Sequence, residues 1–399
     1  MTKKKKILIV MMNLYNGGAE KSLVNLFSEL DSNRYEIDLL LFQKKGLFLK
    51  QVPSYINILE QPRDLFLLYN KPSINDLFKA KNIKLILYRA FASIFVRIKY
   101  RNFNSRARRQ IRWEKFYKKL LSNYDKTYDI SLSYLENEPM RYVIDKTLSQ
   151  KKYVWFHNDY NKLGLLKEYD ISYYEKADKV ITISNECLKV LNSVFPFIKN
   201  KSLYIPNISS KNVIMNLAKE PLKIKYNQEK FKIISIGRLS YEKGFDIAIE
   251  AANLLDKNKV DFQWFIIGDG GMKKKLNKLI KKNNLNNKMQ LIGVTDNPYK
   301  YINSADILVQ SSRSEGKSMV LNEAKILNKP FVVTKYSTVY DQATSKIANI
   351  VEISAQGIAN GIMDLYFNKD KLESLKKNLK KEKNNNEEDI VKYYKLFDE

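Results

Sequence analysis

Residues 232–246 read KIISIGRLSYEKGFD, an apolar run that ends at a glycine and is followed by a charged turn. A short apolar run bounded by glycine is typical of a buried parallel strand, and the pattern after Gly244 is typical of a helix. The same succession of apolar run, turn and helical pattern recurs along the 399-residue chain. This alternation predicts βαβ units and parallel sheets, and therefore an α/β fold.

The predicted strands form two groups, which a polar stretch without clear periodicity separates. They are 7–11, 35–41, 56–59, 129–133, 153–156 and 180–183 in the first group, and 232–236, 262–267, 289–292, 307–310, 330–333 and 349–351 in the second. Two such groups predict two doubly wound domains, in which ligands bind beyond the carboxyl ends of the strands. The expected divisions are a first domain over 1–209, a linker over 210–230, a second domain over 231–384, and a C-terminal helix over 385–399 that packs back on the first domain.

The composition is that of a globular protein with a basic excess. The net charge is +27, with 44% apolar and 28% charged residues. A single cysteine excludes an internal disulfide framework, and a single histidine excludes a multi-histidine metal site. The charge points to an anionic partner, which is nucleic acid, an anionic membrane or a phosphorylated substrate. Seven lysines without an acid between positions 273 and 288 are expected on a solvated helix face.

Many of the other basic residues gather in the segment 77–121, which does not belong to a minimal α/β unit. Positions 79–119 hold 14 basic residues and one acid, including seven of the 12 arginines of the chain. Apolar residues fall on one helical face over 83–98 and again over 113–121. The pattern leaves two structures open: a helix that lies in an anionic membrane interface, or a stripe that packs on the first domain while its charges are solvated. The candidate membrane contacts are Arg101, Arg106, Arg108, Arg109 and Arg112.

No apolar run is long enough to cross a membrane. The start of the chain, four lysines followed by ILIVMM, imitates a signal peptide, but its apolar part is six residues long and Asn13 follows it. We expect this stretch to form a buried first strand. The expected location is the cytoplasm, free or attached to a membrane surface.

Two cations and two carboxylates follow strands in the second half. Arg238 and Lys243 lie five positions apart around a strand-to-helix turn, so both can converge on a diphosphate. Glu315 lies in a loop, where it can accept hydrogen bonds from sugar hydroxyls, and Glu323 lies about two turns into the next helix, where it can bind both hydroxyls of a ribose. The N–H groups expected to face an anion at the start of that helix belong to Lys317, Ser318 and Met319.

Further candidates are glycines and polar residues that stand directly after predicted strands. Glycine lets the backbone approach a ligand closely. His157 follows the run YVWF, which favours a position at a ligand-facing strand end over a place in the core. Glu136 and Glu138 follow ISLSY, where they either reach an acceptor or act as charges at a helix start. The glycine candidates are Gly17, Gly18, Gly237, Gly268 and Gly293, and Val294 follows the last of them.

Taken in order, the motifs resemble those of a known family. They are NGGAE at 16–20, YLENEP at 134–139, WFHND at 155–159, ITISN at 181–185, YIPN at 204–207, GRLSYEKGFD at 237–246, IGDGG at 267–271 and SEGKSMVLNEA at 314–324. The chain resembles a family 4 (group 1) retaining glycosyltransferase over nearly its whole length. That resemblance implies the GT-B fold, which is two facing Rossmann-like doubly wound domains with a deep interdomain cleft.

The resemblance also implies a reaction and residue roles. It implies a hexosyltransferase that moves a sugar from a nucleotide-sugar, most commonly a UDP-sugar, to a hydroxyl with retention of configuration and without a metal or another cofactor. Arg238 and Lys243 would hold the diphosphate and support its departure, Glu323 would bind ribose, and Glu315 would contact the donor sugar. His157 would lie at the donor sugar from the acceptor side, and the Gly17-Gly18 loop would approach the same point.

YLENEP and WFHND resemble bacterial enzymes that build capsular or exopolysaccharide repeat units on a lipid carrier. This implies an undecaprenyl-diphosphate-linked saccharide as acceptor and peripheral attachment to the inner face of the cell membrane. The net charge alone also fits a nucleic-acid- or membrane-binding protein that uses a GT-B scaffold without transferase activity. We expect no nucleic-acid partner, because no recognised nucleic-acid motif is present and the cation and carboxylate pairs would have no role.

Overall fold

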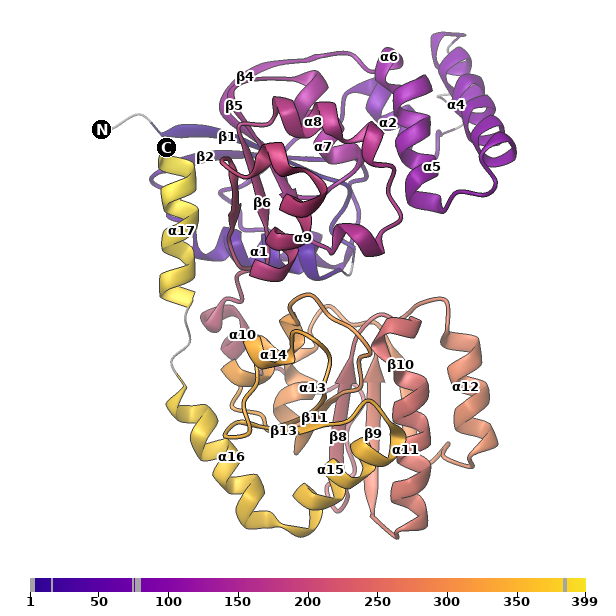
Figure 1. The fold of residues 1–399 in the computed structure, drawn as a ribbon, viewed down its shortest axis with the longest axis vertical. Coiled ribbons are helices and arrows are strands. Elements are labelled where there is room, and N and C mark those ends of the chain that lie inside the picture. Colours follow the sequence, from indigo (N-terminus) through magenta and orange to yellow (C-terminus); the bar gives the residue numbers. More distant parts are fainter. Residues whose placement is uncertain (1–3, 16, 74, 76–79, 383–385) are drawn as a thin grey trace. The chain divides into compact units, whose positions relative to one another are not determined.

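The computed structural model describes residues 4–15, 17–73, 75, 80–382 and 386–399. Asn16 of the NGGAE motif, residues 77–79 of the basic segment and residue 385 of the expected C-terminal helix lie outside the described residues. The chain divides into two compact units, and Figure 1 labels the helices and strands of each. Unit 1 comprises Met1–Ile208 and Glu388–Glu399, and unit 2 comprises Ser209–Glu387.

Unit 1 is built on a parallel sheet, and the sequence predicts all its described strands except β7. Within the described residues this sheet has seven strands in the order β3-β2-β1-β4-β5-β6-β7. The strand order reverses between β1 and β4, where Ile7 lies opposite Ile130. The strands are β1 (Lys5–Met11), β2 (Tyr35–Leu41), β3 (Asn57–Ile58), β4 (Tyr124–Ser133), β5 (Thr147–Phe156), β6 (Lys179–Thr182) and β7 (Ser202–Tyr204).

Helices cover both faces of this sheet, so its strands are apolar on both sides. Successive residues of β1 alternate between two buried clusters: Leu8 and Val10 belong to one, and Ile7 and Ile9 to the other. The last helix of the chain packs on the second cluster through its buried Tyr393. The helices are α1 (Gly18–Glu29), α2 (Arg63–Tyr69), α4 (Ala80–Lys99), α5 (Ser105–Arg112), α6 (Lys118–Leu120), α7 (Glu138–Lys146), α8 (Ile171–Lys176), α9 (Asn185–Val194) and α17 (Asn386–Asp398).

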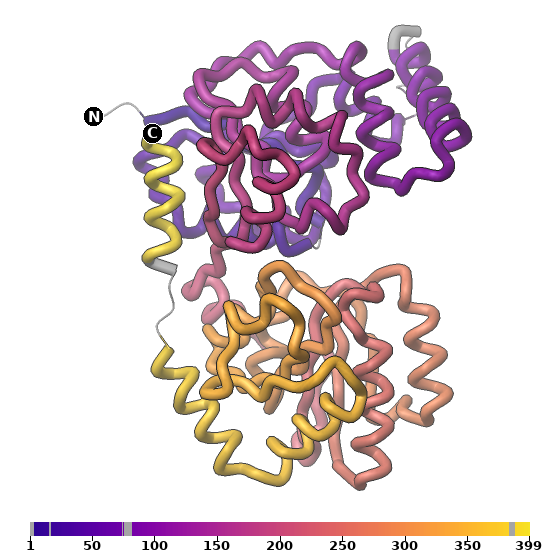
Figure 2. Tube along the Cα trace, viewed as in Figure 1, coloured from indigo at the N-terminus to yellow at the C-terminus, as the bar shows by residue number. Residues whose placement is uncertain are grey.

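Unit 2 repeats the same plan of alternating strands and helices. Figure 2 traces the path of its chain by residue number. Its sheet, as far as the chain is described, is parallel and runs in the order β10-β9-β8-β11-β12-β13, so the reversal lies between β8 and β11. The strands are β8 (Phe231–Ile236), β9 (Phe262–Ile267), β10 (Met289–Gly293), β11 (Ile307–Gln310), β12 (Phe331–Thr334) and β13 (Ala348–Val351). The helices are α10 (Lys211–Leu217), α11 (Phe245–Lys257), α12 (Lys273–Lys282), α13 (Tyr299–Ser304), α14 (Met319–Ile326), α15 (Ala355–Phe367) and α16 (Lys369–Lys381).

The stretch 210–230 differs from the expected linker, because it folds as part of unit 2. It begins with α10, whose N-cap Ser210 accepts a hydrogen bond from the Val213 N–H. Ile214 and Tyr226 are buried in the core of unit 2, and the Tyr226 ring stacks on Phe265. The buried apolar residues of this stretch are Ile214, Ala218 and Tyr226. They are too widely spaced to produce a visible period in the sequence.

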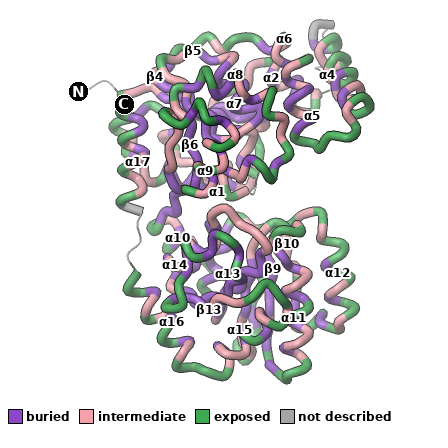
Figure 3. The backbone as a smooth tube through the Cα atoms, in the orientation of Figure 1, coloured by how far each residue is buried: buried purple, intermediate pink, exposed green. Residues whose placement is uncertain are grey.

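The basic segment divides into two parts with opposite environments. The second apolar stripe, over 113–121, is buried in the core of unit 1. It includes Trp113, Phe116 and Tyr117 of a π-helical turn, Trp113–Tyr117, and Leu121 after it. The first stripe, over 83–98, lies on α4 and is exposed. Figure 3 shows exposed residues of this helix in green. Packing on unit 1 therefore accounts for the second stripe but not for the first. In the described ranges, no helix is long and apolar enough to pass through a membrane.

Candidate functional site

The carboxyl edge of the unit 2 sheet brings the loops after β8 and β11 together at the reversal of strand order. This is the position where open parallel sheets bind ligands. Gly244 joins the two loops: its φ is 62°, and a Cβ at this position would lie 2.0 Å from the Ser311 carbonyl oxygen. The Ser311 hydroxyl also donates to the Lys243 carbonyl over 2.9 Å. A glycine is therefore required for the β8 loop to reach the β11 loop.

Lys243 and Glu315 form an ion pair at this edge, with 2.5 Å between Nζ and Oε1. The same carboxylate oxygen accepts hydrogen bonds from Ser312 Oγ at 2.6 Å and from Gln310 Nε2 at 2.9 Å. Three donors on one oxygen fix the Glu315 side chain, and the fixed carboxylate holds the ammonium group of Lys243 at the strand ends. Two residues predicted from separate motifs therefore form one unit.

Arg238 lies on the β8 loop and is exposed. Its side chain forms no ion pair or hydrogen bond with the described part of the chain. A neighbouring arginine, Arg313, is instead held by a bidentate pair with Asp246, both bonds being 2.8 Å long. Arg313 also lies 4.0 Å from the ring centre of Tyr241. Arg238 therefore keeps its charge available for an external anion, whereas Arg313 fastens the β11 loop to α11.

The start of α14 lies after the β11 loop, and a side-chain network fixes it. Ser318 caps the helix by accepting from the Leu321 N–H, and its hydroxyl donates to Gln310 Oε1 over 2.8 Å. The Ser318 N–H, which the sequence predicts to face an anion, donates to Gln342 Oε1 over 2.6 Å. In this structure that N–H is therefore occupied by a side chain from a later loop. Glu323, one turn further along α14, is fully buried.

The loops after β9 and β10 complete this edge. Gly268 has a φ of 156°, and a Cβ there would lie 1.9 Å from the Gly237 carbonyl oxygen. Its N–H donates to the Gly293 carbonyl over 2.8 Å, so the three glycine loops contact one another. Val294, which follows, is exposed.

The carboxyl edge of the unit 1 sheet carries a different set of residues. Gly17 is the N-cap of α1 and Gly18 its first residue, directly after the β1 loop. Glu136 follows β4, and its two carboxylate oxygens accept from the His157 N–H at 3.3 Å and from Asn158 Nδ2 at 2.6 Å. The next residue, Asn137, has a φ of 70°. Glu136 therefore fixes the turn that carries His157.

His157 is buried among aromatic rings. Its ring centre lies 5.0 Å from that of Tyr134 and 6.2 Å from that of Trp155, which in turn stacks on Tyr393 of α17 at 5.3 Å. Neither ring nitrogen has a partner at hydrogen-bond geometry among the described residues. Burial lowers the pKa of His157 to about 3, and the nearby backbone of Tyr134 offsets this only in part. The imidazole is therefore neutral at physiological pH.

The arginines of the basic segment do not share one environment. Arg109 pairs with the buried Glu138, with 2.6 Å between Nη2 and Oε2. Burial alone would raise the pKa of Glu138, but Arg109 outweighs it and the pKa is lowered. Arg112 lies 5.2 Å from the ring centre of Tyr117. Arg101 and Arg106 are exposed, and Arg108 is half-buried.

Several residues that shape the two edges are not among the sequence predictions. Gln310, Ser312 and Gln342 fix Glu315 and Ser318. Tyr134 lies against the His157 ring, and Tyr393 stacks on the neighbouring ring of Trp155. Ser312 and Gln310 stand just before SEGKS, which is the one local signal that could have identified them. Across the residues with described side chains, no group of three His, Cys, Asp or Glu is arranged to hold a metal ion.

The chain is similar to known glycosyltransferases. A family described as "Glycosyl transferases group 1" matches residues 218–382. An uncharacterized glycosyltransferase of Methanocaldococcus jannaschii is 34% identical over 169 residues, and the match covers 42% of each chain. The N-acetylgalactosamine-N,N'-diacetylbacillosaminyl-diphospho-undecaprenol 4-alpha-N-acetylgalactosaminyltransferase of Campylobacter jejuni is 27% identical over 345 residues, which are 84% of this chain and 81% of that protein.

Solved structures share the fold across both units. Anabaena HepE in complex with UDP-glucose aligns with a TM-score of 0.65 at 14% identity, and the alignment covers 98% of each chain. A mutant of S. aureus TarM aligns with a TM-score of 0.63 at 17% identity and covers 99% of this chain and 100% of that one. Residues 218–382 match the group 1 glycosyl transferases, and the solved structures show that the chain has a GT-B fold.

Proposed function

We propose that the protein is a hexosyltransferase that moves a sugar from a nucleotide-sugar to a lipid-linked saccharide during cell-surface polysaccharide synthesis. The observation that carries the proposal is the gathering of Arg238, the Lys243–Glu315 pair and the start of α14 at the reversal point of the unit 2 sheet. Cations and a helix N-terminus at a strand edge suit an anionic diphosphate. The donor therefore binds to unit 2.

The same groups support the departure of the nucleoside diphosphate. When the bond from the sugar to the diphosphate breaks, negative charge grows on the leaving oxygen. Lys243 is already oriented by Glu315, so little reorganisation is needed to stabilise that charge. Arg238 adds a second, unpaired guanidinium. The buried carboxylate of Glu323 binds the ribose hydroxyls, and Glu315 contacts the donor sugar.

UDP is the nucleotide that we propose. HepE and TarM, which share the fold, have been solved with UDP-glucose and with UDP respectively. Retention of anomeric configuration and independence of a metal ion are also part of the proposal. Both rest on the family motifs, and the cations of the unit 2 edge supply charge that a metal would otherwise provide.

The acceptor that we propose is a saccharide on undecaprenyl diphosphate. The C. jejuni relative, named for an acceptor of this kind, aligns with 84% of this chain. His157 of unit 1 contributes a neutral imidazole, which can hydrogen-bond a sugar hydroxyl without adding charge. A lipid-linked acceptor requires a protein that works in the cytoplasm at the inner face of the cell membrane.

The test is sugar transfer by the full chain from a panel of UDP-, GDP- and ADP-sugars to an undecaprenyl-diphosphate-linked saccharide. We expect one UDP-sugar to be used, a product that NMR shows to keep the anomeric configuration of the donor, and unchanged turnover in the presence of a chelator. Absence of transfer and of slow donor hydrolysis across the panel would contradict the proposed activity. An inverted product or loss of turnover with chelator would contradict retention or metal independence alone.

A further inference from the structure

Helix α4 exposes its most apolar face. Leu87 is 63% exposed, Phe91 55%, Ile94 59% and Ile98 69%, and these residues recur at the spacing of one helical face. Large apolar side chains that are exposed together, rather than singly, mark an interaction surface. We call these four residues the α4 ridge.

The opposite face of α4 holds the helix on unit 1. Ala92 and Val96 are buried in the unit 1 core, and the Phe95 ring lies 5.6 Å from that of Phe116. Arg89 donates to the Leu67 carbonyl over 2.7 Å and also to the Asn70 carbonyl. These contacts fix the rotation of α4 and leave the α4 ridge exposed. Phe91 of the ridge also contacts the core, with its ring centre 6.1 Å from that of Phe116.

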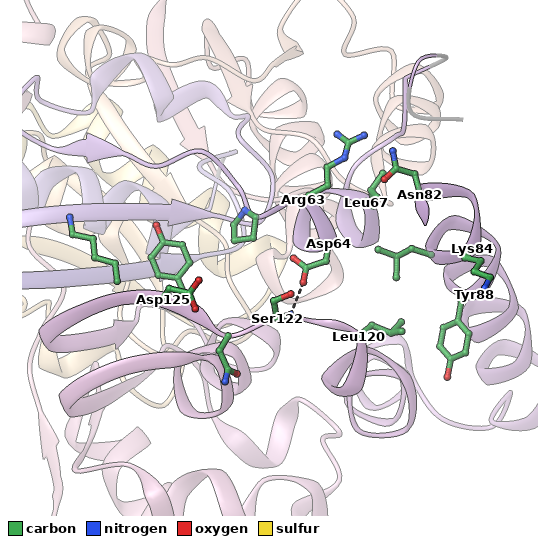
Figure 4. Close-up of a pocket in the computed structure, with 14 residues that line it drawn as sticks. Arg63, Asp64, Leu67, Asn82, Lys84, Tyr88, Leu120, Ser122 and Asp125 are labelled. Carbon is green, nitrogen blue, oxygen red and sulfur yellow. Dashed lines mark hydrogen bonds between the residues drawn. The ribbon is translucent and has the colours of Figure 1, made fainter. Parts of the chain in front are cut away.

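A cavity of about 880 Å³ lies beside α4, and it does not contain the ridge. Figure 4 shows Leu67 and Asp64 from α2, Leu120 and Ser122 ahead of β4, and Tyr88 from α4 along its wall. The Asp64 carboxylate accepts from the Ser122 N–H over 2.5 Å. None of the four ridge residues lines this cavity. The α4 ridge is therefore a separate surface from this cavity, and its four residues remain exposed.

Basic residues flank the ridge. Lys84 and Arg97 are exposed on α4, and Arg101 is exposed in the turn that follows. None of the three has a carboxylate partner in the described part of the chain. The sequence from position 80 to position 113 contains no acidic residue. A protein partner that covered the ridge would have to supply the missing carboxylates, whereas an anionic lipid surface supplies negative charge all around an apolar layer.

We propose that α4 docks the protein on an anionic bilayer, with the α4 ridge in the interface and Lys84, Arg97 and Arg101 at the headgroups. This inference deepens the proposed function, because a lipid-linked acceptor lies at a membrane surface. The observations behind the inference are those of α4. Arg109 is not part of this surface, because it is paired with Glu138. The membrane contacts suggested by the sequence thus shift from the arginines of α5 toward α4 and the turn after it.

The experiment is flotation of the full chain with phosphatidylcholine vesicles that contain phosphatidylglycerol. Replacing Leu87→Ser, Phe91→Ser and Ile94→Ser together should lower the bound fraction at least about tenfold, since three exposed apolar side chains leave the interface. The matched control is Phe367→Ser, a 68% exposed aromatic of unit 2, which should float like wild type. Circular dichroism checks that the ridge variant is folded. We expect an intact fold, because the three replaced side chains are exposed.

A charge series separates lipid attraction from apolar insertion. Lys84→Gln, Arg97→Gln and Arg101→Gln together should weaken binding to the same vesicles and reduce its salt dependence. The control removes the same charge from α12, through Lys274→Gln, Lys275→Gln and Lys278→Gln, whose neighbours Leu276 and Ile280 are buried. Equal loss in both charge variants would overturn the assignment to α4, because net charge alone would then explain binding.

Two further outcomes would overturn the inference. Unchanged flotation of the ridge variant would show that α4 does not bind the bilayer. A wild-type dimer that light scattering shows to be lost in the ridge variant would assign the ridge to a second copy of the chain. Two measurements keep this test separate from that of the proposed activity. Vesicle binding is measured without any donor. Donor hydrolysis is measured without acceptor, and the ridge variant should hydrolyse the donor like wild type.

Discussion

The carboxyl edge of the unit 2 sheet differs in chemistry from that of the unit 1 sheet, although both sheets are parallel and reverse their strand order once. The unit 2 edge carries Arg238, the Lys243–Glu315 pair and the start of α14. The unit 1 edge carries His157, an uncharged imidazole among the rings of Tyr134 and Trp155.

The difference teaches that topology gives the location of a site and the loop residues decide which ligand group it binds. Fixed charges in unit 2 suit a diphosphate, whose charge grows during transfer. The neutral imidazole of His157 in unit 1 carries no charge that would attract a diphosphate. If this division is right, variants of the two edges must fail in different ways.

The largest effect is expected for Lys243→Ala. The change removes a cation from the proposed diphosphate site and leaves the carboxylate of Glu315 there without its ion-pair partner. We expect kcat/KM for transfer to fall about 10³-fold, the scale found when one preorganised electrostatic group is lost. Lys274→Ala on α12 is the control, since this exposed lysine lies outside the edge. A loss in Lys243→Ala no larger than in the control would remove Lys243 from the donor site.

A smaller effect is expected for Glu323→Gln, which keeps the shape of a fully buried side chain. An amide accepts hydrogen bonds more weakly than a carboxylate, so we expect the KM for the donor to rise about tenfold to a hundredfold with a smaller change in kcat. Initial rates at varied donor concentration measure both quantities. An effect confined to kcat would place Glu323 at the reacting atoms rather than at the ribose.

In unit 1 the imidazole of His157 makes stability depend on pH. Its pKa is about 3 in the folded protein against an ordinary value near 6.5, so the unfolded chain binds the proton more readily. The contribution of His157 to the free energy of unfolding is therefore fully present above about pH 6.5 and is lost as the pH drops toward 3. At about pH 5 the loss from this residue is about 2 kcal/mol, from 1.36 kcal/mol per pH unit.

Urea unfolding of wild type and of His157→Phe, at neutral pH and at about pH 5, measures this pH-dependent loss of unfolding free energy. The phenylalanine keeps an aromatic ring in the stack and cannot bind a proton. Wild type should lose about 2 kcal/mol more than the variant on acidification. Parallel losses in the two proteins would mean that His157 is not desolvated in solution.

The smallest effect is expected for Tyr393→Phe in α17. The hydroxyl donates to the Pro206 carbonyl over 2.9 Å, and removing it should cost about 1 kcal/mol of unfolding free energy. The ring that stacks on Trp155 remains, so transfer activity should stay at the wild-type value. A large loss of activity without loss of stability would extend the functional edge of unit 1 to α17.

The strands and most of the edge residues could be predicted because their signals are local. The apolar runs mark the strands, and Arg238, Lys243 and Glu315 stand in the loops that follow two of them, β8 and β11. Parallel strands bring those loops to the same edge of the sheet. Gln342 could not be predicted, because it reaches Ser318 from 24 positions away without any motif of its own. Periodicity also identified the apolar face of α4 but not its direction, since packing against Phe116 decides which face turns outward.

The most direct test of the division between the two edges is calorimetric titration of the full chain with UDP, GDP and ADP. We predict that wild type binds one of them, with UDP expected. Lys243→Gln should weaken that binding at least about tenfold, the effect of losing a charged contact to phosphate. His157→Phe should bind the nucleotide like wild type. Equal affinity in wild type and Lys243→Gln, or an equal loss in both variants, would contradict the assignment of the diphosphate to unit 2.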